Sequence, residues 1–561
     1  MTRADPFDYV IVGAGAAGSV LANRLSEDPA VRVALLEAGP DRNARRWQVR
    51  MPLAMVAFMA PALARMGGAR FINWKRSEPA PGLQGRERDL PRGHGTGGSA
   101  NGNGQIHIRG QREDFDQWRD PGNAGWGHDD LVPCWRKLEW FDLLTNPASG
   151  RHLTVAGGSL GTGIDPALHG TVGPLTIAAP HFVNPMTRIF LAAARAAGFA
   201  LTPDFNGARQ SGVGFYHFTQ SGGERVTAEA ACLNPVRHRA NLTILAGHKV
   251  RRVVMAGTRA VGVECGDKGV TDRREVILSA RTSASPHLLM LSCIGPARDL
   301  ARHGIPLVQD VPGVGGNLPD QPNITLEYKA RTAVPYGIWW RSLPRNMAHV
   351  PDWLFRRRGL FASTTAEAGG FVPTVAGVER PDFQLSFCAG VANTRNASGF
   401  TGHGVLLHVC QLCPGSTGRL TLKDRDRETR PAVLYNFFRG ASSVEPLRHG
   451  VRLARRIMAQ AAFARHIAAE WTPGPDVDSD DAIDGFIRNR VGTLFHPVGT
   501  CAMGVGSDAV VNPANLRLYR VDGLRVVDAP VMPVLVSANT VAATCCLAEK
   551  AEDLIRAEQS P

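Results

Sequence analysis

The stretch FDYVIVGAGAAGSVLANRLSEDPAVRVALLEAGP, residues 7–40, decides the fold of this chain. Its apolar runs predict a buried strand over 7–12 and a second strand over 31–36, and its spacing predicts a helix over 19–26 between them. A glycine-rich turn joins the first strand to the helix, and Glu37 closes the second strand. This order of strand, tight turn, helix and strand is typical of the first half of a doubly wound parallel sheet.

The turn carries its glycines in the pattern G-x-G-x-x-G, at Gly13, Gly15 and Gly18. In this pattern the first glycine permits the tight turn, the second lets the backbone approach a pyrophosphate, and the third lets helix and strand pack closely. The helix N-terminus favours negative charge, and Glu37 is placed to accept hydrogen bonds from a ribose. The stretch therefore predicts a dinucleotide site; a glycine-rich turn without a ligand is the alternative. The motif alone does not separate NAD from FAD, but its place at the N-terminus favours FAD.

A second informative stretch, GLRVVDAPVMPVLVSANTVAATCCLAEKAEDLIRAE, lies at residues 523–558. It predicts a short strand over 524–527 that ends at Asp528, and a helix over 540–557 with one buried face. Residues 537–539 occupy the cap positions of that helix.

Motifs along the whole chain resemble those of the glucose–methanol–choline (GMC) oxidoreductases, which bind FAD. Beside the glycine motif, these are PRGHGTGGSANGNGQIHIRG from residue 91, SARTSASPHLLMLSCIGPARDLARHGIPLVQDVPGVGGNLPDQP from 279, HPVGTCAMG from 496 and DAPVMPVLVSANTVAAT from 528. The resemblance implies an α/β (overall α+β) chain. It implies a doubly wound Rossmann-type FAD domain from residues 1–160, 220–320 and 485–561, and an antiparallel-sheet substrate domain from 161–219 and 321–484.

By the resemblance, His496 is the catalytic base and Asn539 the second catalytic residue. A neutral imidazole can take the hydroxyl proton of an alcohol while the α-carbon gives a hydride to the flavin. The Asn539 amide can donate a hydrogen bond to the developing alkoxide. The cofactor-binding residues that the resemblance implies are Gly13, Gly15, Gly18, Glu37, Trp74, Gly97, Gly98, Ser99, Asn103, the Val250 backbone, Asp528 and Thr540.

The substrate is predicted to be a small, largely apolar primary alcohol, aromatic or furanic. Asn539, where other members carry a second histidine, is similar to the pattern of 5-hydroxymethylfurfural oxidases and choline oxidases. Phe495, Trp339 and Trp340 are candidates for an aromatic pocket wall, with ordinary packing as the alternative for each. The electron acceptor is left open between oxygen and another acceptor.

Five positions depart from the family pattern, and one of them is Cys413, which stands where the family usually has an arginine before a proline. Gly102 stands where members with a covalent flavin have a histidine, so the flavin is predicted to bind without a covalent bond. Arg281 and Cys293 replace glycines that the family usually has, and Ala100 replaces a serine. Arg281 in particular puts the local backbone and its cofactor contacts in question.

Other readings of the motifs remain open from the residues alone. His496 could be a packed core histidine, a zinc ligand or, with Cys501, half of a nucleophile pair. Two pairs of side chains could be considered as zinc ligands: His496 with Cys501, and Cys410 with Cys413. Each pair offers too few ligands for a zinc site, so no metal is predicted. A flavoprotein of the same fold without net alcohol oxidation, a lyase or photodecarboxylase, is the alternative function. The family's photodecarboxylases lack the motif histidine and have a cysteine at the position of Leu412.

Composition limits the remaining classes. The 561 residues carry a net charge of +13, spread along the chain as arginine rather than gathered in a basic motif, so no nucleic-acid partner is predicted. The longest apolar run, over 51–66, is shorter than the ~18–20 residues of a membrane span. The first strand leaves no room for a signal peptide and the ten cysteines are scattered, so a cytoplasmic enzyme is expected. Residues 40–90 are predicted to cover the flavin, and 419–438 to form a hairpin of the antiparallel sheet.

Overall fold

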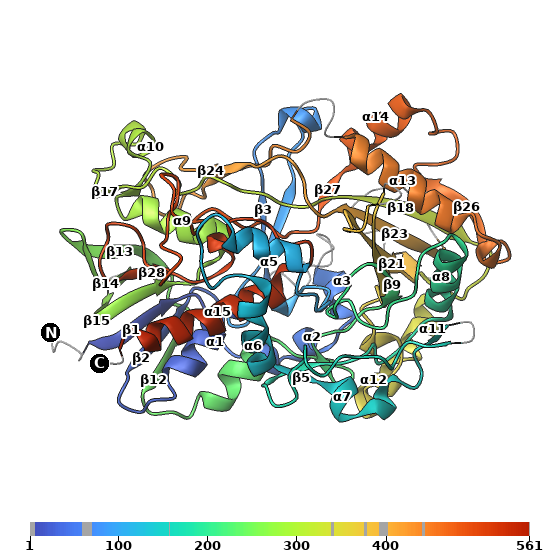
Figure 1. The fold of residues 1–561 in the computed structure, drawn as a ribbon, viewed down its shortest axis with the longest axis horizontal. Coiled ribbons are helices and arrows are strands. Elements are labelled where there is room, and N and C mark those ends of the chain that lie inside the picture. Colours follow the sequence, from blue (N-terminus) through green and yellow to red (C-terminus); the bar gives the residue numbers. More distant parts are fainter. Residues whose placement is uncertain are drawn as a thin grey trace.

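Two sheets of seven strands each organise the chain (Figure 1). The structure is a computed structural model. It describes residues 6–58, 70–155, 158–266, 268–337, 341–374, 378–391, 402–439 and 444–559.

The first sheet is parallel at its centre, as the sequence predicts. Its strands run in the order β12, β2, β1, β15, and β28 pairs with β15 on the far side. The antiparallel strands β14 and β13 extend β15. The bounds are β1 (Phe7–Val12), β2 (Val33–Glu37), β12 (Leu242–Ala246), β13 (Val250–Ala256), β14 (Arg259–Cys265), β15 (Lys268–Leu278) and β28 (Leu524–Val526).

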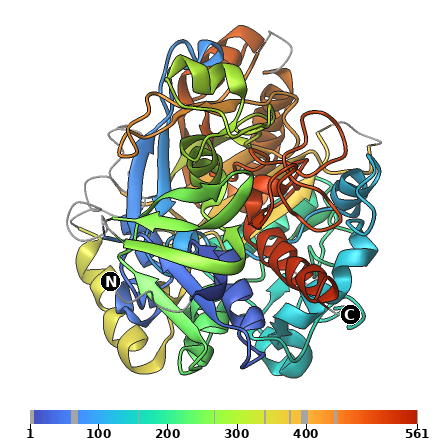
Figure 2. The same cartoon turned by 90° about the vertical axis from the view of Figure 1, so that its left-hand side faces the viewer.

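The helices at the two ends of the chain lie against each other and against this sheet. α1 (Ala16–Leu25) follows the glycine turn, and α15 (Thr540–Ala557) packs against both α1 and α6 (His128–Leu138). Figures 1 and 2 show the red α15 beside the first sheet. The predicted strand over 7–12 and helix over 540–557 are confirmed to the residue. The predicted helix over 19–26 begins three residues earlier, and the strand over 31–36 begins two residues later.

The second sheet is antiparallel and forms the roof of the site. Its order is β26, β18, β23, β21, β20, β9, with β27 pairing β18. α8 (Pro185–Ala196) and α13 (Glu445–Met458) pack on it. The bounds are β9 (Gly212–Phe215), β18 (Pro322–Ala330), β20 (Ala368–Val372), β21 (Phe383–Cys388), β23 (Gly404–Gln411), β26 (Ile467–Thr472) and β27 (Gly492–Thr493).

The hairpin predicted over 419–438 forms, but its place in the large sheet was predicted wrongly. Among the described strands, β24 (Arg419–Thr421) and β25 (Ala432–Leu434) pair only with each other, in a two-stranded sheet beside α9 (Arg281–Leu291). Only three residues of each strand are paired, and Leu318, four residues before the start of β18, bridges to Gly418 instead of extending the sheet. The two-domain boundaries stay a prediction, and β27 joins the second sheet although it lies in a piece assigned to the first domain.

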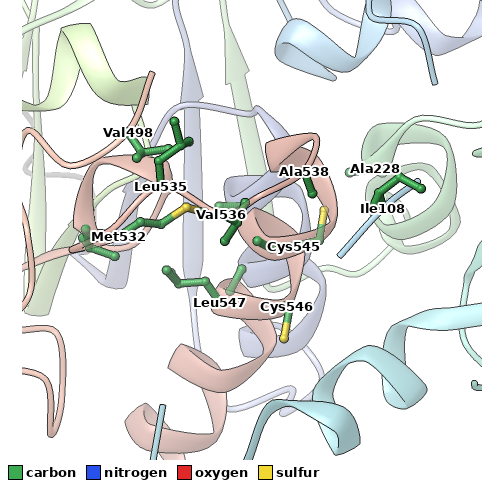
Figure 3. Close-up of a cluster of buried hydrophobic side chains, with 14 of the residues drawn as sticks. Ile108, Ala228, Val498, Met532, Leu535, Val536, Ala538, Cys545, Cys546 and Leu547 are labelled. Atoms are coloured by element: carbon green, nitrogen blue, oxygen red, sulfur yellow. The ribbon is translucent and has the colours of Figure 1, made fainter. Parts of the chain in front are cut away.

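A packed apolar cluster fixes the C-terminal segment that leads to Asn539 (Figure 3). Leu535, Val536 and Ala538 of the loop before α15 are at most 4% exposed, and they lie with Val498 and with Cys545 of the helix in one cluster. Burying each Leu or Val side chain contributes about 1.5–3 kcal/mol. This loop is therefore held in one conformation up to the residue that begins the helix. Within the described ranges, no helix is both long and apolar enough to cross a bilayer.

Candidate active site

A cavity of about 530 Å³ lies between the second sheet and the glycine-rich segment that follows β4 (Asp89–Gly93). One wall comes from β18, β21 and β23, and the opposite wall from the glycine-rich loop after β4 and the N-terminus of α15. Leu53, Met55, Val56 and Ile72 add a third side, so part of the predicted cover over 40–90 does border the cavity. The predicted site residues that line the cavity are Ser99, Asn103, Phe495, His496, Asn539 and Thr540.

The imidazole of His496 is held in one orientation and one tautomer. Its Nδ1 lies 2.7 Å from Oε1 of Gln321. The amide of Gln321 is itself oriented, because its Nε2 donates to the carbonyl oxygens of Leu412 and Val536 at 3.2 and 3.1 Å. An oxygen therefore faces Nδ1, which must carry the hydrogen. The lone pair is left on Nε2, the nitrogen that lies 3.3 Å from Nδ2 of Asn539.

His496 is neutral over the whole physiological range. Burial is the main cause that lowers the pKa of His496 to about 3, and the positive charge of Arg92 contributes to the same shift. The backbone N–H of His496 donates to Oδ1 of Asp320 at 2.9 Å, which fixes the main chain below the ring. Phe495, one residue earlier, has a φ of +66°, a left-handed conformation that costs a non-glycine residue about 1–3 kcal/mol. Such stored strain is typical of functional sites.

Asn539 begins α15 but does not cap it with its side chain. Its backbone is extended, as an N-cap residue requires, yet within the described chain its side chain accepts no hydrogen bond from the first turn. Oδ1 instead accepts from Nε2 of Gln384 at 3.4 Å, which turns Nδ2 toward His496. The donor and the lone pair lie 3.3 Å apart in the cavity wall, so an alcohol oxygen beside them can be within hydrogen-bond distance of both nitrogens.

The predicted dinucleotide turn has the geometry that its glycines imply. Gly13 has a φ of +107°, and a Cβ there would lie 2.4 Å from the carbonyl oxygen of Ser279. A Cβ on Gly18 would lie 1.9 Å from the oxygen of Gly13. Gly15, in contrast, borders open space: no heavy atom of the described residues lies within 4 Å of a Cβ built there. Gly98, from the second glycine loop, approaches Gly15 from the facing side. The turn therefore has room for a diphosphate at the N-terminus of α1.

Glu37 is buried and already accepts three backbone hydrogen bonds. They come from Ala14 at 3.1 Å, Gly39 at 2.9 Å and Gly95 at 3.2 Å. The carboxylate thus ties the glycine turn to the second glycine loop. A ribose bound to Glu37 would donate to the same carboxylate oxygens that accept these three backbone hydrogen bonds. The ribose contact of Glu37 stays a prediction.

The other predicted cofactor residues lie at several places around this turn. Asp528 accepts from the N–H groups of Arg281 and Ala529, each at 2.8 Å, and burial raises the pKa of Asp528 to about 6. Gly97 donates its N–H to the carbonyl oxygen of Ala14. Val250 begins β13, and Trp74 lies on β3 (Ile72–Arg76) against the cluster of Phe58 and Phe71. Trp339 and Trp340 lie outside the described residues.

Arg281 and Cys293 keep the backbone that a glycine would adopt. Their φ values are +77° and +70°. This left-handed conformation costs an L-residue roughly 1–2 kcal/mol. The replacement of glycine therefore leaves the main chain in the glycine-like conformation and adds strain. It also adds a guanidinium close to the charges of Glu37 and Asp528.

The structure disfavours the competing readings of His496. Among the described residues, no group of three or more His, Cys, Asp or Glu side chains could hold a metal ion. Cys501 is fully buried, and burial raises the pKa of its thiol, so a thiolate nucleophile is disfavoured. His496 lines a cavity instead of filling a core.

Sequence reasoning missed Gln321 and Gln384, the two amides that orient the side chains of His496 and Asn539. Gln321 lies inside the quoted motif NLPDQP, and Gln384 lies on β21. Neither residue type signals a role by itself, because an amide becomes informative only when its partners are known.

Comparison with known proteins was made for the whole chain. A family model described as GMC oxidoreductase matches residues 7–323, and a second model with the same description matches 414–548. The chain belongs to the GMC oxidoreductases. Members of this family bind FAD, and the open turn at Gly15 has room for the diphosphate of that cofactor.

Individual relatives of this GMC oxidoreductase cover nearly its full length. The chain is 37% identical to an alcohol dehydrogenase [acceptor] of Pseudomonas putida, over 98% of this chain and 95% of that protein. It is also 37% identical to an oxygen-dependent choline dehydrogenase of Pseudomonas aeruginosa, over 99% and 95%. The crystal structure of pyridoxine 4-oxidase from Mesorbium loti is similar, with a TM-score of 0.83 and 30% identity over 99% of this chain and 100% of that one.

The low pKa of His496 gives a prediction for the pH dependence of the reaction. For His496 as the predicted base, the neutral imidazole is the form that can take a proton, and protonation begins only near the pKa of about 3. We expect the rate constant of flavin reduction to be flat between about pH 5 and pH 8, whereas an ordinary histidine would lose tenfold by about pH 5.5. Stopped-flow absorbance measures this rate.

The variant Gln321→Glu is the control for that prediction. A carboxylate facing Nδ1 stabilises the imidazolium and raises the pKa of His496. The acid limb of the rate profile should therefore move to higher pH. A wild-type limb centred near pH 6.5 would contradict the assignment of His496 as a buried neutral base.

Proposed function

We propose that this GMC oxidoreductase oxidises a primary alcohol to an aldehyde, with FAD as the hydride acceptor and His496 as the base. The observation that carries the proposal is the convergence of the Nε2 lone pair of His496 and the Nδ2 donor of Asn539, 3.3 Å apart, in the wall of the cavity. When bound, FAD supplies an acceptor for the hydride. The Gly13–Gly18 turn, Glu37 and the loop at Gly97–Ser99 are the groups that would hold it.

The protein's own residues then have separate tasks. Nε2 of His496 takes the hydroxyl proton, and Gln321 keeps the lone pair on that nitrogen by accepting from Nδ1. Nδ2 of Asn539 donates to the alcohol oxygen as its negative charge develops, and Gln384 keeps that donor in position. The N-terminus of α15 at Thr540 favours negative charge in the same region.

The cavity favours an alcohol that carries further hydrogen-bonding groups. The roof strands place Asn323 and Thr325 of β18, Gln384 and Ser386 of β21, and His408 of β23 in its lining. Oδ1 of Asn323 and Oε1 of Gln384 are buried, and within the described part of the chain they have no hydrogen-bond partner. Phe495 is the aromatic side chain beside the base. We therefore infer a flat primary alcohol, aromatic or furanic, with at least one more donor group.

Choline is the second candidate. The carboxylate-bearing Glu327 lies in the cavity lining, and a choline dehydrogenase is 37% identical over nearly the whole chain. A quaternary ammonium group needs such a negative or aromatic partner. Glu327 is only 8% exposed and accepts a hydrogen bond from Thr472, so it is less available than the amides of the roof.

A substrate panel tests the proposal. Turnover is compared on benzyl alcohol, furfuryl alcohol, pyridoxine, choline and glucose, with oxygen and with an artificial dye as acceptor. We expect pyridoxine, the flat alcohol of this panel that carries additional hydroxyl groups, to be oxidised fastest. Faster turnover on choline or glucose than on every flat alcohol would overturn the substrate assignment. If none of the alcohols bleaches the flavin in the dark, the result would favour a lyase or photodecarboxylase. His496 and Leu412 argue against that class.

The flavin is predicted to be held without a covalent bond. Gly102 offers no side chain for a link, and the nearby histidines are engaged elsewhere. His107 lies 2.9 Å from Glu139, and His94 lies 3.3 Å from the carbonyl oxygen of Arg70. Acid precipitation of the yellow protein should leave the colour in the supernatant, and a yellow pellet would contradict this prediction.

The ten cysteines fit the cytoplasmic location that we propose for the protein. All ten are described, and each of them is free.

A further inference from the structure

Residues 341–358 present an apolar stripe to the outside of the molecule. They form two short helices, α11 (Leu343–Met347) and α12 (Val350–Arg356), at the lower right of Figure 1. Phe355 is 85% exposed, Leu354 51% and Met347 49%. On α12, Pro351, Leu354 and Phe355 are spaced by three and four residues and so share one face. A folded chain rarely leaves neighbouring large apolar side chains in water without a partner.

The opposite face of α12 is anchored, so the stripe is not a loosely packed helix. Trp353 is 2% exposed and its Nε1 donates to the carbonyl oxygen of Gly223. Arg357 lies over the Trp353 ring at 4.6 Å and pairs with Glu224 at 2.6 Å. The same Glu224 pairs with Arg50 of α2 (Trp47–Arg50), whose Trp47 is also 59% exposed. The outward direction of Leu354 and Phe355 is therefore fixed.

The stripe has a strongly basic border. Residues 341–358 contain five arginines and one acid, Asp352. Arg341, Arg345, Arg356 and Arg358 are exposed, and Asp352 pairs weakly with Arg356 at 3.5 Å. An apolar face bordered by arginines is the pattern of helices that lie in the surface of a bilayer with anionic lipids. The overall charge of +13 adds to the same attraction.

The segment also borders the active-site cavity. Asn346, between exposed Arg345 and Met347, lines the cavity, and so does Leu360, two residues beyond the segment. A surface seated on α11 and α12 would therefore lie next to one wall of the site that contains His496.

We propose that residues 341–358 form a docking surface for an anionic lipid bilayer, with Leu354 and Phe355 inserted among the lipid chains and Arg356 and Arg358 on the head groups. The arginines of this segment favour an anionic bilayer over a neutral one. The exposed Leu354 and Phe355 favour a bilayer over a partner that offers charge alone.

Co-sedimentation with lipid vesicles tests the proposal on the full holoenzyme. We expect binding to vesicles of phosphatidylcholine with phosphatidylglycerol, and at least tenfold weaker binding to phosphatidylcholine alone. Raising NaCl from about 0.1 M to about 0.5 M shortens the Debye length from about 10 Å to about 4 Å and should weaken the binding. No binding of the wild type to anionic vesicles would overturn the proposal.

Two double variants and their matched controls assign the surface. Arg356→Glu with Arg358→Glu should weaken binding about 25-fold or more, since each lost arginine costs about fivefold. Leu354→Ser with Phe355→Ser should weaken it at least tenfold. The controls are Arg298→Glu with Arg302→Glu on α10 (Ala297–Arg302), and Val172→Ser with Val505→Ser, all at exposed positions outside residues 341–358. Circular dichroism and flavin content confirm that each variant is folded.

The outcomes separate the possible occupants. If the α10 control loses as much binding as the α12 charge variant, the net charge acts without a specific surface and the proposal fails. If sedimentation velocity shows a wild-type dimer that Phe355→Ser dissolves, and vesicles are not bound, the stripe is an interface between copies and the proposal is wrong. Loss confined to the α12 variants supports it.

Discussion

The variant His496→Ala should retain FAD yet reduce its flavin with alcohol about 10²–10⁴-fold more slowly than the wild type. The structure gives three reasons. The ring lines the cavity, its Nδ1 hydrogen is fixed by Gln321, and its Nε2 lone pair faces the donor of Asn539. Alanine removes the proton acceptor, whereas the glycine turn and Glu37, which are predicted to hold the cofactor, are unchanged. Stopped-flow reduction under anaerobic conditions measures the loss, and absorbance at the flavin maximum measures the cofactor content.

External imidazole separates a missing base from a damaged core. The deletion leaves a space open to the cavity, where imidazole from the buffer can act as base. We expect partial recovery of the reduction rate with imidazole, and none with an aliphatic alcohol of similar size. A variant that reduces its flavin at the wild-type rate across the pH range would show that His496 is a packing residue and that another group takes the proton.

Local signals made the two ends of the chain predictable. A glycine pattern between two apolar runs specifies strand, turn and helix within 34 residues, and the helix over 540–557 follows from its apolar spacing and its cap positions. The backbone of such units depends mainly on neighbouring residues. The pairing of His496 with Asn539 was predictable only through the family motifs, because nothing local distinguishes His496 from a buried core histidine.

Long-range pairing explains what could not be predicted. The polar roof depends on which face of β18 and β21 meets the cavity, and a shift of one residue would exchange Asn323 and Thr325 for Ile324 and Leu326. Register is set by partners far along the chain, such as the pairing of Asn323 with Cys410. The same limit explains the short hairpin at β24 and β25, whose alternation does not show which sheet it joins.

Two asparagines at helix starts allow the second catalytic assignment to be tested within one molecule. Asn184 begins α8 and caps it, with its Oδ1 accepting from Met186 N–H at 2.9 Å. Asn539 begins α15 without such a bond, and its amide faces His496 instead. The two residues therefore have the same position on a helix but different uses for the side chain.

Asn539→Ala should slow flavin reduction about 10²–10³-fold, the usual loss for one oxyanion donor, and leave thermal stability nearly unchanged. Asn184→Ala should do the reverse, costing about 1 kcal/mol of unfolding free energy with wild-type chemistry. Anaerobic stopped-flow and denaturant unfolding give the two readouts. Asn539→His, which restores a donor at the same position, should recover part of the rate. If Asn539→Ala loses stability like Asn184→Ala while its folded fraction reacts at the wild-type rate, Asn539 acts on the helix and not on the alcohol.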